Sequence, residues 1–141
     1  MRAALLTACL AFVPANTDAH ACTYREPDQM KVLRMSGEPG FAVALVRIVA
    51  VEPPRSGDGN VHGWRAQAKV ERVVRGERSE RTVPLVGGLD TDACGDGRPL
   101  PAIGSLWFAY FGKGEAHPRV IEPADRDALS DPKPFLFPTR D

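Results

Sequence analysis

The sequence is poor in cysteine and in aromatic residues, and it has no excess of either charge. Among its 141 residues there are three cysteines, two tryptophans and two tyrosines, and 18 basic residues balance 18 acidic ones. A chain without net charge has no long-range field that would gather nucleic acid or anionic lipid, so we expect neither as a partner. This length suffices for one domain with its own core and is too short for two ordinary domains.

No apolar segment is long enough to span a bilayer. The N-terminal run over residues 3–13 follows a single positive charge at Arg2 and precedes the small residues Ala19 and Ala21. This pattern is typical of a secretory signal peptide. We therefore expect residues 1–21 to be removed by cleavage after Ala21, and the mature chain to be secreted or periplasmic.

Removal of the signal peptide leaves two cysteines. Cys9 lies within the signal, whereas Cys22 and Cys94 remain in a chain exported to an oxidising compartment. An even pair of cysteines in such a chain indicates a disulfide, so we predict a Cys22–Cys94 bridge. A lipid anchor on Cys22 or Cys9 is the alternative, because residues 6–9 resemble a lipoprotein box.

The hydrophobic pattern predicts a β protein. Thirteen glycines and thirteen prolines disfavour a helical bundle. Residues 64–70 alternate strictly between apolar and polar, as a half-buried antiparallel strand does, and the alternation slips at residues 71–74, as at a bulge. Pro84 confines the strand around it to a sheet edge or a bulge. Further strands are expected at residues 41–51, 81–86, 105–111 and 119–121, a brief helix at 124–129, and an arm or a single helical turn within 23–40.

Four or five strands in a chain of this size fit a small, closed or partly open antiparallel barrel of the OB type. An immunoglobulin-like sandwich is the alternative fold, but it needs about seven strands. We assign residues 22–122 to the barrel and 123–141 to an extension with a short helix and a proline-rich tail that carries Phe135-Leu136-Phe137. The residues expected to share one core are Val43, Leu45, Ile48, Trp64, Val70, Leu106 and Phe108.

Several short motifs occur in an order and spacing similar to those of a known family. An N-terminal cysteine and a long apolar strand precede Ala68-Lys69-Val70-Glu71-Arg72-Val73-Val74-Arg75-Gly76, then Ala93-Cys94-Gly95 and Gly104-Ser105-Leu106-Trp107-Phe108-Ala109-Tyr110. Over residues 22–112 the chain resembles the OB-fold domain of the tissue inhibitors of metalloproteinases and their bacterial netrin-module-like relatives. The resemblance implies that Cys22 is tied to Cys94. Tyr24 stands where the animal inhibitors carry a second early cysteine.

The resemblance also implies a means of inhibiting a zinc protease. The α-amino nitrogen and the carbonyl oxygen of a mature N-terminal Cys22 can close a five-membered ring on a Zn²⁺ ion and displace its catalytic water. Deprotonation of the amine costs little, because an α-amino group has an ordinary pKa of about 7.7 to 8.0. Thr23 would point into the protease pocket beside the zinc. Cys22 and Thr23 are therefore the candidate protease contacts.

No catalytic, cofactor or metal motif accompanies these features. His62 and His117 have no metal ligands at suitable spacing, and no nucleophile motif of the Gly-x-Ser-x-Gly kind occurs. The acidic loop at residues 90–96 has Pro101 where a calcium loop needs a glutamate. We therefore expect a non-enzymatic binding module that needs no cofactor. Its partner is expected to be a protein, and a zinc metalloprotease is one candidate. An enzyme whose site is assembled from dispersed residues is the remaining alternative.

Overall fold

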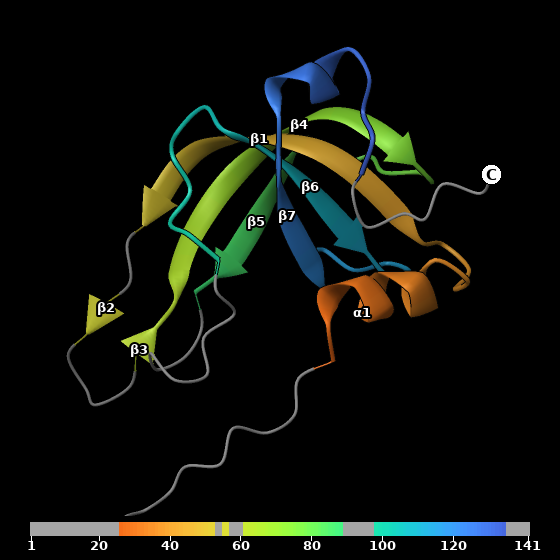
Figure 1. Ribbon diagram of the computed structural model, residues 1–141, viewed down its shortest axis with the longest axis horizontal. Helices are drawn as coiled ribbons and strands as arrows, with labels where there is room; N and C mark the ends of the chain where they lie inside the picture. The colour runs from red at the N-terminus through yellow and green to blue at the C-terminus, as the bar shows by residue number, and fades with distance from the viewer. Residues whose placement is uncertain (1–25, 53–54, 57–60, 89–97, 135–141) are drawn as a thin grey trace, which may run out of the picture.

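One five-stranded sheet organises the computed structural model, which describes residues 26–52, 55–56, 61–88 and 98–134 (Figure 1). The five strands of the sheet and the short C-terminal helix fall within or close to the segments predicted from the sequence. In chain order the elements are α1 (Asp28–Met35), β1 (Ala42–Glu52), β2 (Arg55–Ser56), β3 (Val61–His62), β4 (Trp64–Arg75), β5 (Thr82–Gly87), β6 (Leu106–Phe111), β7 (Val120–Ala124) and the 3-10 helix η1 (Arg126–Leu129).

The sheet has the strand order β5-β4-β1-β6-β7, and every neighbouring pair is antiparallel. β1, β4 and β5 follow one another as neighbours, and β6 returns to the other side of β1, which is Greek-key connectivity. β7 then pairs with β6. In the described part of the chain no ladder joins β5 to β7, so the sheet is open at these two edges. The predicted antiparallel β class is confirmed, and closure into a barrel is not seen.

The register between β1 and β4 has three irregularities. On β4 it skips Glu71 and Val74, so the predicted slip of the alternation is a bulge, and on β1 it skips Val49. Gly76 follows β4 with a φ of 73°, and a Cβ atom there would lie 2.4 Å from the carbonyl oxygen of Phe41. Only glycine combines this backbone angle with so close an approach.

Both edge strands contain a proline. Pro84 lies in β5, which is an edge strand as predicted, and Pro123 lies in β7. The amide of Val70 donates a hydrogen bond of 2.9 Å to the carbonyl oxygen of Arg81. By the alternation of an antiparallel ladder, the nitrogen of Pro84 then faces away from β4. The ladder between β4 and β5 therefore loses no donor at this proline.

α1 forms where the sequence predicts an arm or a single turn. Val32 and Met35 lie on one face of this helix and are fully buried, whereas Met30 and Leu33 are about half exposed. Asp28 lies in the first turn, where the helix dipole favours a negative charge. Residues 28–35 form two turns of helix because Val32 and Met35, three positions apart, pack together against the outer face of the sheet.

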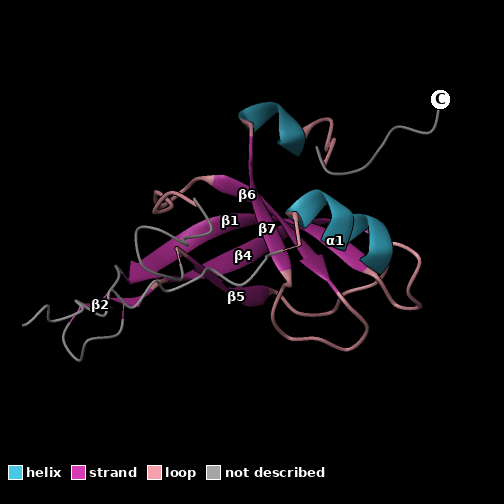
Figure 2. Ribbon diagram, turned by 60° about the horizontal axis from the view of Figure 1, so that its bottom comes forward, coloured by secondary structure: helices cyan, strands magenta, loops and turns pink. Residues whose placement is uncertain are grey.

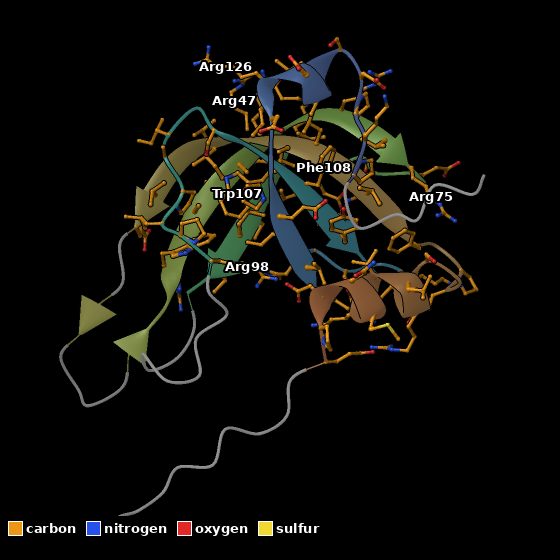
Figure 3. The ribbon with its side chains drawn as sticks, in the orientation of Figure 1. Arg47, Arg75, Arg98, Trp107, Phe108 and Arg126 are labelled. Carbon is orange, nitrogen blue, oxygen red and sulfur yellow. The ribbon has the colours of Figure 1, made fainter. Side chains whose placement is uncertain are left out.

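Buried apolar side chains lie on both faces of the sheet, so it has two cores instead of the single core that we predicted. On the inner face, around which the sheet curls, Trp64 and Trp107 meet in a T-shaped contact with ring centroids 5.9 Å apart. On the outer face, α1 and η1 cover β1, β6 and β7. Trp107 and Phe108 are adjacent on β6 and belong to different cores (Figure 3). Of the predicted core residues, Ile48 and Trp64 lie in the inner core, Val43, Leu45, Leu106 and Phe108 lie in the outer core, and Val70 is only partly buried.

Candidate functional site

The helices cover only part of the outer face of the sheet. The buried residues of the outer core come from α1, β1, β6, β7 and η1 and the residue before β1, but not from β4 or β5. Figure 2 shows α1 beside β7, at one side of the sheet. Arg65, Gln67 and Val86, which point outward from β4 and β5, are exposed. We call the uncovered surface over β4, β5 and the adjoining end of β1 the open face.

A bulge in β1 sets which residues reach the open face. Up to Ile48 the even-numbered side chains of β1 point into the inner core. Because the register skips Val49, Ala50 pairs with Gln67 and Glu52 pairs with Arg65. Ala50 and Glu52 therefore point outward, and Val51 packs against the inner core instead. The bulge thus brings a small residue and a carboxylate to the open face.

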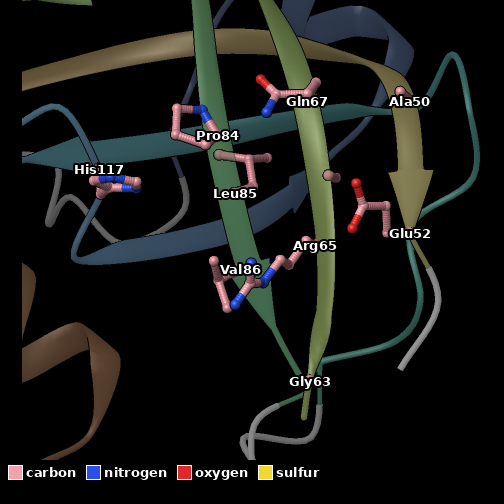
Figure 4. Close-up of a pocket in the computed structure, with 10 residues that line it drawn as sticks. Ala50, Glu52, Gly63, Arg65, Gln67, Pro84, Leu85, Val86 and His117 are labelled. Carbon is pink, nitrogen blue, oxygen red and sulfur yellow. The ribbon is translucent and has the colours of Figure 1, made fainter. Parts of the chain in front are cut away.

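A trough of about 430 Å³ crosses the open face (Figure 4). Its floor is made by small or apolar groups of three adjacent strands, and polar side chains stand along it. The β6–β7 loop contributes one residue, His117, at the β5 side. The lining residues are Ala50, Glu52, Gly63, Arg65, Ala66, Gln67, Pro84, Leu85, Val86 and His117.

The trough offers hydrogen-bond donors and acceptors but no nucleophile. The Arg65 guanidinium and the Gln67 amide make no hydrogen bond or ion pair within the described part of the chain, whereas Glu52 has a partner. None of the lining residues is serine, threonine or cysteine, so His117 has no hydroxyl or thiol beside it to activate. Across the described ranges no three His, Cys, Asp or Glu side chains gather as metal ligands. The chemistry on offer is recognition of a polar ligand through charge and hydrogen bonds.

The sequence offered no metal ligands at a suitable spacing from His117, and in the structure this histidine is an exposed residue of the β6–β7 loop. Sequence reasoning gave no sign that His117 lies near β5, because the two are brought together only by the curl of the sheet. The outward turn of Glu52 was also missed. The bulge that causes it lies in an apolar run. Because the residues around Val49 do not alternate between apolar and polar, the sequence shows no break at the bulge.

A second depression, of about 590 Å³, lies between the loop before β6 and η1. Arg47 lines it, but its Nε donates to Glu71 Oε1 at 2.7 Å and its Nη1 donates to the carbonyl oxygen of Gly104 at 3.1 Å. Arg126 lies at the same end of the molecule (Figure 3) and has no hydrogen-bond or ion-pair partner in the described part of the chain. Ile103, which is 72% exposed, also lines this depression. Arg126 and Ile103 therefore provide comparison positions outside the trough.

The candidate site residues at the N-terminus, Cys22 and Thr23, lie outside the described residues, as do Cys94 and the signal segment 1–21. The described segments that follow the two cysteines meet at one ion pair. Arg98 pairs through Nη2 with Oδ2 of Asp28 on α1, and its Nε donates to the carbonyl oxygen of Ile121 at 3.1 Å. This arginine is only 11% exposed. The start of α1 is thus anchored to the segment that leads into β6.

Arg78 links the loop between β4 and β5 to the loop between β6 and β7. The Arg78 guanidinium stacks over the Phe111 ring at 3.7 Å and donates to the carbonyl oxygen of Glu115 at 2.8 Å, which joins the β4–β5 loop to the β6–β7 loop. Its side chain is 5% exposed. Hydrogen bonding from Arg119 lowers the pKa of the Glu115 carboxyl below its ordinary range, so this carboxylate is ionised at neutral pH.

The part of the chain that the structure describes contains no helix both long and apolar enough to cross a membrane. A scan against protein-family models and searches of curated proteins and of solved structures find no match to this chain.

Proposed function

We propose that the protein is an exported, non-enzymatic binding module that holds its partner on the open face. The observation that carries this proposal is the trough, where Arg65 and Gln67 are exposed and unpartnered over a floor of small and apolar groups. A surface with donors and acceptors but no adjacent nucleophile favours binding over group transfer. Glu52 and His117 at the two sides of the trough add an acceptor and a titratable group.

The OB-type barrel remains part of this proposal. The order β5-β4-β1-β6-β7 is that of a five-stranded Greek-key barrel opened between its third and fifth barrel strands, which here are β5 and β7. Arg78 joins the loops next to those two strands through Phe111 and Glu115. A side-chain link at this place favours a partly open barrel over a flat sheet.

Site-specific photo-crosslinking in the producing cells tests the binding face. A diazirine-bearing residue in place of Gln67 is expected to yield adducts of higher mass on irradiation, because the amide projects into the trough. The same residue in place of Arg126 serves as the control, since that side chain is equally free but lines the other depression. Adducts of equal yield from the two positions, or none from position 67, would contradict the proposal.

Export and the Cys22–Cys94 disulfide belong to the same proposal, and the ion pair of Arg98 with Asp28 supports the disulfide. Asp28 is six residues after Cys22, and Arg98 is four residues after Cys94. Because an extended residue spans about 3.3 Å, both cysteines have the reach to meet beside this ion pair. The bridge would then reinforce an anchor that the side chains already form.

The same anchor favours metalloprotease inhibition as a second candidate function. Chelation of zinc by the Cys22 amine and carbonyl requires a terminus held in place, and α1 begins close behind it. One alanine inserted before Cys22 is expected to abolish inhibition while leaving the thermal unfolding midpoint unchanged, because it moves the free amine away from the chelating carbonyl. Inhibition constants against a panel of zinc proteases measure the effect, with Lys133→Ala as the surface control. Inhibition that survives the insertion would rule out chelation.

A further inference from the structure

A row of cations runs along β4 on the open face. Arg65, Lys69 and Arg72 point outward and are exposed, and none of them has a hydrogen-bond or ion-pair partner among the described residues. Arg47 on β1 lies directly opposite Lys69. We call these four residues the cationic stripe. The overall neutrality of the chain conceals this local concentration of positive charge.

The stripe costs the fold stability. Like charges directly opposite each other on neighbouring strands repel, as Arg47 and Lys69 do here. One carboxylate, Glu71, approaches Arg47 to 2.7 Å and offsets one of these charges. Glu52 stands opposite Arg65 at the far end, without pairing to it. Arg65, Lys69 and Arg72 therefore remain as unneutralised charges that a ligand can use.

The geometry of the stripe fits an extended anion. With a rise of about 3.3 Å per residue, the three cations of β4 span about 23 Å along the strand, less a small shortening at the bulge. A single phosphate or carboxylate would meet one of them only. A linear polymer with regularly spaced negative charges would meet all three and would run into the trough, where Gln67 stands between Arg65 and Lys69.

The surroundings of the stripe distinguish among polyanions. Every Phe, Tyr and Trp side chain in the described residues is buried, so the His117 imidazole is the one exposed ring that lines the trough, and no row of rings is present on which successive nucleic-acid bases would stack. Among the described residues of β4 and β5, Val86 is the only exposed large apolar side chain, and it is too small to anchor a protein interface. The trough adds an amide, a carboxylate and an imidazole, groups that hydrogen-bond hydroxyls.

We propose that the cationic stripe binds a linear acidic polysaccharide, with its carboxylate or sulfate groups along β4 and its hydroxyls in the trough. This inference rests on the proposed binding function and names the chemical class of the partner. Because the attraction is mainly between exposed charges, added salt weakens it. Neutral sugar chains lack the charges and gain only the hydrogen bonds of the trough.

Titration of the full mature protein with polygalacturonate and with dextran sulfate tests the inference, with neutral dextran as the matched uncharged polymer. We expect binding to at least one acidic polymer and none to dextran. The double variant Lys69→Gln/Arg72→Gln is expected to lose at least tenfold in affinity. The control double variant Lys31→Gln/Lys113→Gln removes the same charge from α1 and from the β6–β7 loop, away from the stripe, and is expected to change affinity by less than twofold.

Three results would overturn the inference. These are no binding to either acidic polymer, an equal loss in the two double variants, or tighter binding of a single-stranded thymidine oligonucleotide than of the polysaccharides. The last result would assign the stripe to nucleic acid. None of these outcomes bears on crosslinking from position 67, so failure of the polysaccharide assignment is distinguishable from failure of the binding function.

Discussion

Truncation of Phe108 to alanine is expected to lower the free energy of unfolding by about 3 to 5 kcal/mol, the cost typical of a fully buried phenylalanine. Phe108 is 0% exposed and packs in the outer core, between the sheet and the helices α1 and η1. The cavity left behind would lie within the close-packed outer core, so the truncation removes both the transfer free energy of the ring and its packing contacts. Urea unfolding followed by circular dichroism measures the difference.

Ile103→Ala provides the comparison, because this side chain is 72% exposed and its truncation is expected to change stability by no more than about 0.5 kcal/mol. A similar small change in Phe108→Ala would contradict the burial of the outer core. The two-core arrangement also predicts that α1 loosens in this variant, since Val32 and Met35 lose a neighbour.

Loss of the proposed Cys22–Cys94 disulfide is expected to cost roughly 4 kcal/mol, because the cross-link closes a long loop and restricts the unfolded chain. Intact-mass measurement of the exported protein without reductant should give a mass lower by two hydrogens than that of the reduced form. The double variant Cys22→Ser/Cys94→Ser should unfold at lower urea concentration, and reductant should shift the wild type to match it.

Two free thiols in the exported protein would refute the bridge. A variant that removes the ion pair alone, Asp28→Asn, separates the two anchors of α1, because it leaves the cysteines in place. We expect this variant to keep the lower oxidised mass. We also expect Asp28→Asn to lower the free energy of unfolding by less than the loss of the disulfide does. The size of this decrease measures how much the ion pair of Asp28 with Arg98 stabilises α1 against the sheet.

Much of the fold was predictable because its strands have simple patterns. β4 alternates strictly from Trp64 to Val70, and the run from Phe41 to Val51 is too apolar for anything but a central strand. The existence of two cores was not predictable in this way. All six residues of β6 are buried, so its sequence has no polar side chains to reveal that odd and even positions face different cores.

The candidate site was less predictable than the fold. The balanced net charge argued against a long-range field and left a local patch open, and it did not reveal that Arg65, Lys69 and Arg72 share one face of β4. The bulge at Glu71 shifts the alternation of β4 by one residue, so that Arg72 points outward like Arg65 and Lys69. The sequence indicates a bulge in this segment but does not show which side chains it turns outward. His117 reaches the trough only through the tertiary curl of the sheet, which no local pattern encodes.

The two edge prolines bear on how this protein behaves at high concentration. An open sheet presents unpaired backbone groups at each side, and such edges are templates for growth into fibrils. Pro84 leaves a gap in the outward row of donors on β5, and Pro123 places a second proline in the five-residue strand β7. A strand from another copy would meet a missing hydrogen bond near the middle of either edge. The two prolines therefore allow the sheet to keep its two free edges without recruiting strands from other copies into an aggregate.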